Sequence, residues 1–194
     1  MQLLIFTILL IIYFVIHSAL ASHSVKNILI DKWIAKKYYR LAFNAVAIIS
    51  LIPILFAFIT IESANLFVSP HASTIGLTLA GIGILVLLIA LSQYNLSEFS
   101  GIQQLRTEKN LPPQTLKTNG FNAIVRHPLY FAGLMIIWGA FLYKPNIKMV
   151  IVASIATLYL YFGIKLEEQK LLIEFGEEYK IYQNKVAMLI PFLK

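Results

Sequence analysis

The stretch Arg126-His127-Pro128-Leu129-Tyr130 places polar and ionisable side chains directly before an apolar run, Phe131 to Trp138. Pro128 suits the first turn of a helix, where its missing N–H costs no hydrogen bond. The chain is therefore predicted to enter a membrane here, with the arginine and the histidine at the surface. Two interpretations are open, because these polar residues can be an interfacial anchor in front of a helix or a site. A second polar pair, Glu167-Glu168, follows a later apolar run and favours the site.

The composition indicates an integral membrane protein. Hydrophobic residues make up 59% of the 194 residues and charged residues only 13%, with a mean hydropathy of +0.76. No water-soluble domain of this size needs so much apolar surface. The net charge of +7 comes from Lys and Arg confined to short segments between apolar runs, which favours membrane orientation over nucleic-acid binding. The absence of cysteine excludes disulfides, zinc–thiolate sites and cysteine nucleophiles.

Five apolar segments are each predicted to form a membrane-spanning helix, which needs about 20 mostly apolar residues. They cover about Leu3–Ala21, Leu41–Ile61, Ser73–Ser92, Leu129–Tyr143 and Met149–Leu166. A short turn joins the last two segments, so these are expected to form a tight helical hairpin. The predicted fold is an all-α integral membrane protein with a single domain over residues 1–194. Residues 1–92 hold three N-terminal spans, and residues 93–194 hold a polar loop, the hairpin and a C-terminal helix.

Two of these segments carry a further signal. The first has a cleaved signal peptide as its alternative interpretation, since Ala19-Leu20-Ala21 resembles a cleavage site. Its length and the lack of a basic residue before it argue for a span instead. The third contains small residues that permit close helix contact, namely Gly76, Ala80, Gly81 and Gly83.

The charges of the loops predict the orientation. Five basic residues against one acidic residue give the segment Lys26–Arg40 a net charge of +4, which predicts the cytoplasmic side. The loop Glu62–Ala72 has no Lys or Arg and is expected outside. With five spans, the N-terminus is then outside and the C-terminus is cytoplasmic, and only Lys144 and Lys148 oppose this pattern.

Two polar segments lie outside the spans. The longest, Gln93–Arg126, has roughly 34 residues and includes the loop signals Pro112-Pro113 and Asn119-Gly120, so it is the natural place for function. In the last segment, apolar residues recur at helical spacing at Leu171, Phe175, Tyr179, Tyr182 and Val186. This pattern predicts an amphipathic cytoplasmic helix from Glu167 to about Val186.

A tight hairpin would bring together the polar residues at the cytoplasmic ends of the last two spans. These residues are Arg126, His127, Tyr130, Glu167 and Glu168. Such a set can hold a polar ligand with an apolar partner, because ionisable groups at membrane depth are costly and usually functional. A metal site is the alternative. One histidine with two adjacent carboxylates lacks the ligand spacing of zinc sites, so no metal is expected.

Around these residues the chain resembles a group of membrane methyltransferases. The group contains isoprenylcysteine carboxyl methyltransferase, phosphatidylethanolamine N-methyltransferase and methanethiol S-methyltransferase. The matching pieces are Leu116–Gly120, Val125–Tyr130, Glu167–Leu171, Phe175–Tyr179 and Ile190-Pro191. Their order, their separation by one hairpin and the Phe-Gly-x-x-Tyr pattern make the match specific, whereas Arg-His-Pro-x-Tyr alone would be weak.

The resemblance implies S-adenosylmethionine as cofactor, bound at the cytoplasmic face, and methyl transfer to a small apolar or lipid-like substrate. The partners are then this substrate and membrane lipid. The residues implied to bind the cofactor are Leu116, Lys117, Thr118, Gly120, His127, Pro128, Leu129, Tyr130 and Glu167. A sulfonium cation beside an α-amino group favours nearby carboxylates and aromatic faces, which Glu167 and Tyr130 offer. Arg126 and Glu168 are the candidate catalytic residues, to orient the nucleophile or take its proton.

Two residues depart from the family's pattern. Asn122 stands where a tyrosine often follows the glycine by two positions. Gly163 stands four residues before Glu167, where the prenylcysteine enzymes resemble one another in having an arginine suited to a substrate carboxylate. The expected nucleophile is therefore a neutral thiol, amine or hydroxyl. The alternative from another class is a non-catalytic membrane assembly factor or small transporter on the same scaffold.

Overall fold

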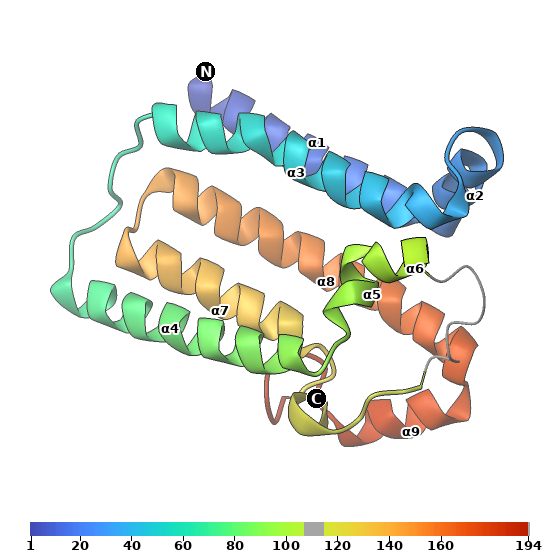
Figure 1. Ribbon diagram of the computed structural model, residues 1–194. Helices are drawn as coiled ribbons and strands as arrows, with labels where there is room; N and C mark the ends of the chain where they lie inside the picture. The colour runs from blue at the N-terminus through green and yellow to red at the C-terminus, as the bar shows by residue number, and fades with distance from the viewer. Residues whose placement is uncertain (107–114, 194) are drawn as a thin grey trace. The chain divides into compact units, whose positions relative to one another are not determined.

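The computed structural model describes residues 1–106 and 115–193. Within these ranges the chain is helical apart from turns, loops and two isolated β-bridges (Figure 1). The predicted loop signal Pro112-Pro113 lies outside the described residues. The described residues form two compact units, the first from residues 1–62 and 94–106 and the second from residues 63–93 and 115–193.

The first unit is built on two long apolar helices. Its helices are α1 (Gln2–Ala21), α2 (His23–Lys32), α3 (Lys36–Thr60), α5 (Leu96–Ser100) and α6 (Ile102–Arg106). α1 packs along α3, with the Phe6 and Phe58 ring centroids 6.1 Å apart. The short helix α2 was not predicted, and it begins directly after α1 because the Ser22 hydroxyl accepts a hydrogen bond from the backbone N–H of Val25.

The second unit contains the predicted hairpin and its polar end. Its helices are α4 (Pro70–Ser92), the 3₁₀ helix η1 (Gly120–Ala123), α7 (Pro128–Tyr143), α8 (Ile147–Phe175) and α9 (Glu177–Lys185). Side chains before two of these helices fix where they begin. Ser69 accepts a hydrogen bond from the Ala72 N–H, and Asn146 accepts one from the Met149 N–H at 3.0 Å.

Four of the five predicted spans are helices long and apolar enough to cross a membrane. These are α1, α3, α4 and α8. Only 11% to 22% of the residues in their most apolar windows are buried, so most of their apolar side chains face outward, as expected for helices in lipid. The remaining predicted span is α7, which has 16 residues and is shorter than the about 20 that a span needs. A multi-pass membrane protein is therefore supported, with four long apolar helices and one short apolar helix in the part of the chain that the structure describes.

The main partner of α7 is α4 rather than α8, which corrects the expectation that the last two spans pack mainly on each other. Glycines on both helices permit the close approach. A Cβ atom at Gly139 of α7 would lie 2.6 Å from the Ala80 nitrogen and 2.7 Å from the Gly76 oxygen of α4. Since only glycine fits there, three of the small residues of α4, Gly76, Ala80 and Gly83, form a close helix interface, whereas a Cβ atom at Gly81 would meet nothing within 4 Å.

We expect Gly139→Ala to destabilise the protein by about 1–3 kcal/mol, because the added methyl group would meet backbone atoms that cannot move independently. Gly133→Ala on the same helix is the matched control, since a Cβ atom there meets nothing within 4 Å. Thermal unfolding in detergent micelles would measure both variants. Equal midpoints for the two would contradict the close packing of α4 on α7.

The predicted amphipathic helix from Glu167 to Val186 is instead two helices. Its first part, through Phe175, continues α8, and its second part is α9. Gly176 separates them with φ +55°, a left-handed conformation that favours glycine and ends α8. Tyr179 and Tyr182 of the predicted apolar face are buried, so α9 does pack with that face inward.

Candidate active site

The turn before α7 is held by the C-terminal segment of the chain. The helix begins at Pro128, as predicted. The backbone N–H of Arg126 donates to the Ala187 oxygen at 2.8 Å, and that of His127 donates to the Met188 oxygen at 3.3 Å. A parallel β-bridge also joins Val125 to Ala187. Residues more than 55 positions apart thus fix the backbone of the Arg-His-Pro turn.

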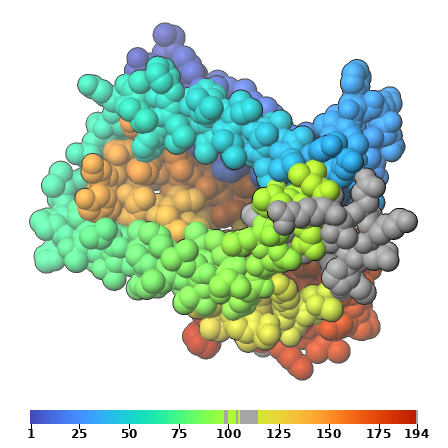
Figure 2. Space-filling model, in the orientation of Figure 1, coloured from blue at the N-terminus to red at the C-terminus, as the bar shows by residue number. Residues whose placement is uncertain are grey.

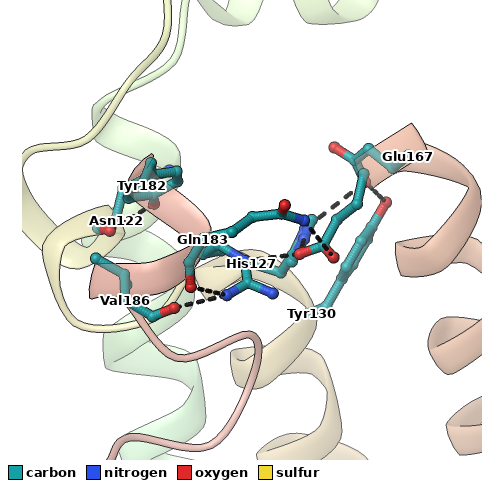
Figure 3. Close-up of polar contacts among 9 residues, drawn as sticks. Asn122, His127, Tyr130, Glu167, Tyr182, Gln183 and Val186 are labelled. Atoms are coloured by element: carbon teal, nitrogen blue, oxygen red, sulfur yellow. Dashed lines mark hydrogen bonds and ion pairs between the residues drawn. The ribbon is translucent and has the colours of Figure 1, made fainter. Parts of the chain in front are cut away.

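The Arg126 guanidinium links the ends of α8 and α9. Its Nε donates to the Glu168 Oε1 atom of α8 at 2.7 Å. Its Nη1 donates to the backbone oxygens of Gln183 at 3.1 Å and Val186 at 2.6 Å, which belong to the C-terminal end of α9 (Figure 3). A cation suits this end, because the last carbonyls of a helix lack helical partners and carry partial negative charge.

Glu168 is buried and has protein partners on both oxygens. Besides Arg126, its Oε1 faces the Nε2 atom of His127 at 3.2 Å, and its Oε2 accepts a hydrogen bond from the Gln183 amide at 3.1 Å. Burial and the Glu168 carboxylate also raise the pKa of the Tyr179 hydroxyl well above its ordinary value. Tyr179 therefore stays protonated, and Glu168 belongs to a buried network rather than to an open surface.

Glu167, by contrast, is the accessible carboxylate of the pair. Its side chain is 45% exposed, whereas that of Glu168 is 7% exposed. The Tyr130 hydroxyl donates to Glu167 Oε2 at 2.8 Å, across from α7 to α8 (Figure 3). The Tyr130 ring stacks on the His127 ring, with the ring centroids 5.5 Å apart and an angle of 10° between the ring planes. One half-exposed carboxylate is thus held beside two aromatic rings.

The loop before η1 lines a hollow of about 650 Å³. The lining residues are Gln93, Thr115, Leu116, Lys117, Thr118, Asn119 and Gly120. The Lys117 ammonium donates to the Gln93 backbone oxygen at 2.6 Å, which ties the loop to the end of α4. Figure 2 shows this loop against the end of α4, beside the C-terminal segment. Gly120 has φ +61° and lies so close to the Gln93 side chain that a Cβ atom would clash with it.

A second contact connects this loop to α9. The Tyr182 hydroxyl donates to the Asn122 backbone oxygen at 2.6 Å, and both residues are buried (Figure 3). Asn122 is therefore buried where the loop packs against α9, and its side chain is covered by protein.

The structure places the predicted site residues in two neighbouring groups of the second unit. Arg126, His127, Tyr130, Glu167 and Glu168 are joined by direct contacts, as the hairpin argument predicted. Leu116, Lys117, Thr118 and Gly120 line the hollow. Pro128 is buried and Leu129 is half-buried in the first turn of α7. Sequence reasoning missed Gln93 and Gln183, because glutamine carries no signal until tertiary contacts place it.

Comparisons with known proteins point to the group that the sequence resembles. Methanethiol S-methyltransferase of Crocosphaera subtropica is 32% identical over 119 residues, which is 60% of this chain and 46% of that protein. Methanethiol S-methyltransferase 1 of Bradyrhizobium diazoefficiens is 34% identical over 98 residues, which is 49% of this chain and 34% of that protein. The enzyme of that name from Pseudomonas deceptionensis is 39% identical over 71 residues, or 37% of this chain and 26% of that protein.

The similarity to methanethiol S-methyltransferase-like relatives is therefore confirmed, although this chain spans less than half the length of each of these relatives. No solved structure matches the chain. A family model described as Protein of unknown function (DUF1295) matches residues 8–186, which is nearly the whole chain. The chain belongs to the DUF1295 family.

Proposed function

We propose that this protein is an S-adenosylmethionine-dependent methyltransferase that acts on a small or apolar nucleophile at the cytoplasmic face of a membrane. One observation carries the proposal. Of two adjacent glutamates at the polar end of α8, Glu168 has protein partners on both oxygens, while Glu167 is half-exposed beside Tyr130 and His127. The names of the relatives support the reaction class.

The residues present fit the proposed cofactor. S-adenosylmethionine carries an α-ammonium group and a sulfonium cation, which a carboxylate and aromatic rings attract. Glu167 and Tyr130 supply these groups, and the hollow at residues 115–120 has a volume within the range of about 300–1,000 Å³ typical of ligand pockets. Lys117 and the backbone of the same loop add polar groups to its wall.

The cofactor, when bound, supplies an electrophilic methyl group. The chain's own residues would contribute binding, alignment and exclusion of water, because an in-line displacement depends mainly on the placement of the two reactants. Glu167 would hold positive charge, and Tyr130 would fix the carboxylate through its hydroxyl. Through their ion pair, Arg126 and Glu168 would hold the turn before α7 in a fixed position relative to α8.

The residue at position 163 of α8 supports a small neutral substrate. Two hydrogen bonds join these antiparallel helices, Tyr130 to Glu167 at 2.8 Å and Trp138 to Thr157 at 3.0 Å. Along the sequence, Gly133 of α7 and Gly163 of α8 each lie between the two residues of their helix that make these hydrogen bonds. A Cβ atom at either glycine would meet nothing within 4 Å. With glycine in place of an arginine at position 163, a prenylcysteine carboxylate has no cationic partner there, which favours a thiol, amine or hydroxyl.

Membranes that contain the protein are expected to transfer label from methyl-labelled S-adenosylmethionine to a methanethiol-like thiol or to an amine. The panel should include short thiols, phosphatidylethanolamine and prenylcysteine, with Glu167→Ala membranes as the control. Methylation of the prenylcysteine carboxylate and of no thiol or amine would refute the argument from Gly163. Failure to methylate any of them, with folded protein, would favour the non-catalytic alternative.

The proposed orientation has the N-terminus outside and the C-terminus in the cytoplasm. Cysteines placed at the exposed Lys36 and Lys180 should react with an impermeant thiol reagent only from the cytoplasmic side. A cysteine at the exposed Lys144, in the turn between α7 and α8, should react only from the other side. The absence of native cysteine keeps the labelling specific. Labelling of Lys36 and Lys180 positions from opposite sides would contradict this topology.

A further inference from the structure

Glu168 can act on a ligand only through another residue. Its Oε1 accepts a hydrogen bond from the Arg126 Nε at 2.7 Å and lies 3.2 Å from the His127 Nε2, while its Oε2 accepts one from the Gln183 amide at 3.1 Å. Because both oxygens are engaged by these protein groups, Glu168 offers no free acceptor to a substrate. His127 is the neighbour through which Glu168 can influence the site, because its ring also stacks on Tyr130.

The contacts of His127 indicate which of its ring nitrogens donates to Glu168. A carboxylate oxygen can only accept, so the hydrogen in the contact with Glu168 belongs to His127 Nε2. The other ring nitrogen, Nδ1, lies 3.8 Å from Glu167 Oε2, beyond hydrogen-bond distance, and that oxygen already accepts from Tyr130. Arg126 balances the charge of Glu168 at 2.7 Å, so this pair does not require a second cation.

We infer that Glu168 is a positioning residue that fixes His127 in the neutral tautomer with hydrogen on Nε2, which leaves Nδ1 as an acceptor on the side of Glu167. Arg126 and Gln183 hold Glu168 in place for this task. Glu168 then acts as a buried carboxylate that orients a histidine, and it does not touch the reactants.

This arrangement also indicates which group of the ligand binds beside His127, and that inference rests on the proposed function. Nδ1 of His127 and the carboxylate of Glu167 form two acceptors 3.8 Å apart. An ammonium group has three N–H donors and can reach both at once. The α-ammonium group of S-adenosylmethionine is the chemical group that this acceptor pair suits.

Nitrogen NMR of the ligand-free protein tests the inference without any cofactor. The protein is labelled with ¹⁵N-histidine in detergent micelles, and His127→Gln identifies the His127 signals among the four histidines. Two-bond proton–nitrogen spectra near neutral pH should show hydrogen on Nε2 and none on Nδ1. Hydrogen on Nδ1, or on both nitrogens, would overturn the inference.

Variants of Glu168 give a second readout. Glu168→Leu should populate both tautomers and weaken S-adenosylmethionine binding by about tenfold or more, as for a lost contact to a charged group. Glu168→Gln keeps an acceptor oxygen and should retain more of the wild-type spectrum, while the exposed Glu174→Gln should change neither readout. If Glu168→Leu kept the wild-type tautomer, the inference would fail.

The two proposals fail separately. A wild-type protein with hydrogen on Nε2 that binds no S-adenosylmethionine would support the positioning role and refute the proposed function. Tight binding of S-adenosylmethionine to a protein with hydrogen on Nδ1 would support the proposed function and refute the positioning role.

Discussion

Replacing Glu168 by alanine is expected to destabilise the protein by about 3–5 kcal/mol, the usual result of leaving one charge of a buried ion pair without its partner. The Arg126 side chain is 10% exposed, so little of its guanidinium is in contact with solvent in the folded protein. The same change also removes the acceptor for His127 and for Gln183. Unfolding in detergent, followed by circular dichroism, measures the loss.

A double-mutant cycle separates the ion pair from its surroundings. Arg126→Leu combined with Glu168→Leu should be less destabilising than the sum of the two single changes, because no uncompensated charge remains buried. Recovery should be incomplete, since Arg126 also donates to the carbonyls at the end of α9. The exposed Glu174→Ala is the control and should lie within about 0.5 kcal/mol of wild type. A Glu168→Ala protein as stable as this control would contradict the buried network.

Glu167→Ala, on the adjacent residue, is expected to affect binding rather than folding. Its loss should weaken S-adenosylmethionine binding by about 1.5–3 kcal/mol, roughly 10- to 100-fold, as for a hydrogen bond to a charged group. Because the side chain is 45% exposed, the unfolding midpoint should change little. His127→Ala should weaken binding by a similar amount, with some loss of stability because His127 is buried.

Tyr130→Phe is the matched variant for this prediction. It removes the hydroxyl that holds Glu167 but keeps the ring that stacks on His127. Its effect on binding should therefore be smaller than that of Glu167→Ala. Unfolding of both Glu167→Ala and His127→Ala without a separable binding defect would favour the interpretation of these residues as interfacial anchors.

Much of the fold could be predicted because apolar segments of 15 or more residues leave few alternatives to a helix. The pairing of helices could not be predicted in the same way. Gly76 and Gly139 are small in the sequence, but only the structure shows that each lies against the backbone of the other's helix. Likewise, the periodicity after Leu166 continues across Gly176, so it could not reveal that this glycine adopts φ +55° and starts a new helix.

The candidate site, like the fold, could be predicted from the sequence only in part. His127 and Glu167 could be nominated because ionisable residues at the ends of apolar segments are rare and conspicuous. The difference in burial between Glu167 and Glu168 could not be predicted, since adjacent residues of one type look equivalent in a sequence. It arises because α9 and Arg126 surround Glu168, while Glu167 faces outward from the same helix turn.

Calorimetric titration of S-adenosylmethionine into the detergent-purified protein tests the central claim most directly. We expect saturable binding to the wild type, with affinity reduced about tenfold or more by Glu167→Ala and unchanged by the exposed Glu174→Gln. A folded wild-type protein that shows no saturable binding, or a Glu167→Ala protein that binds as tightly as the wild type, would contradict it.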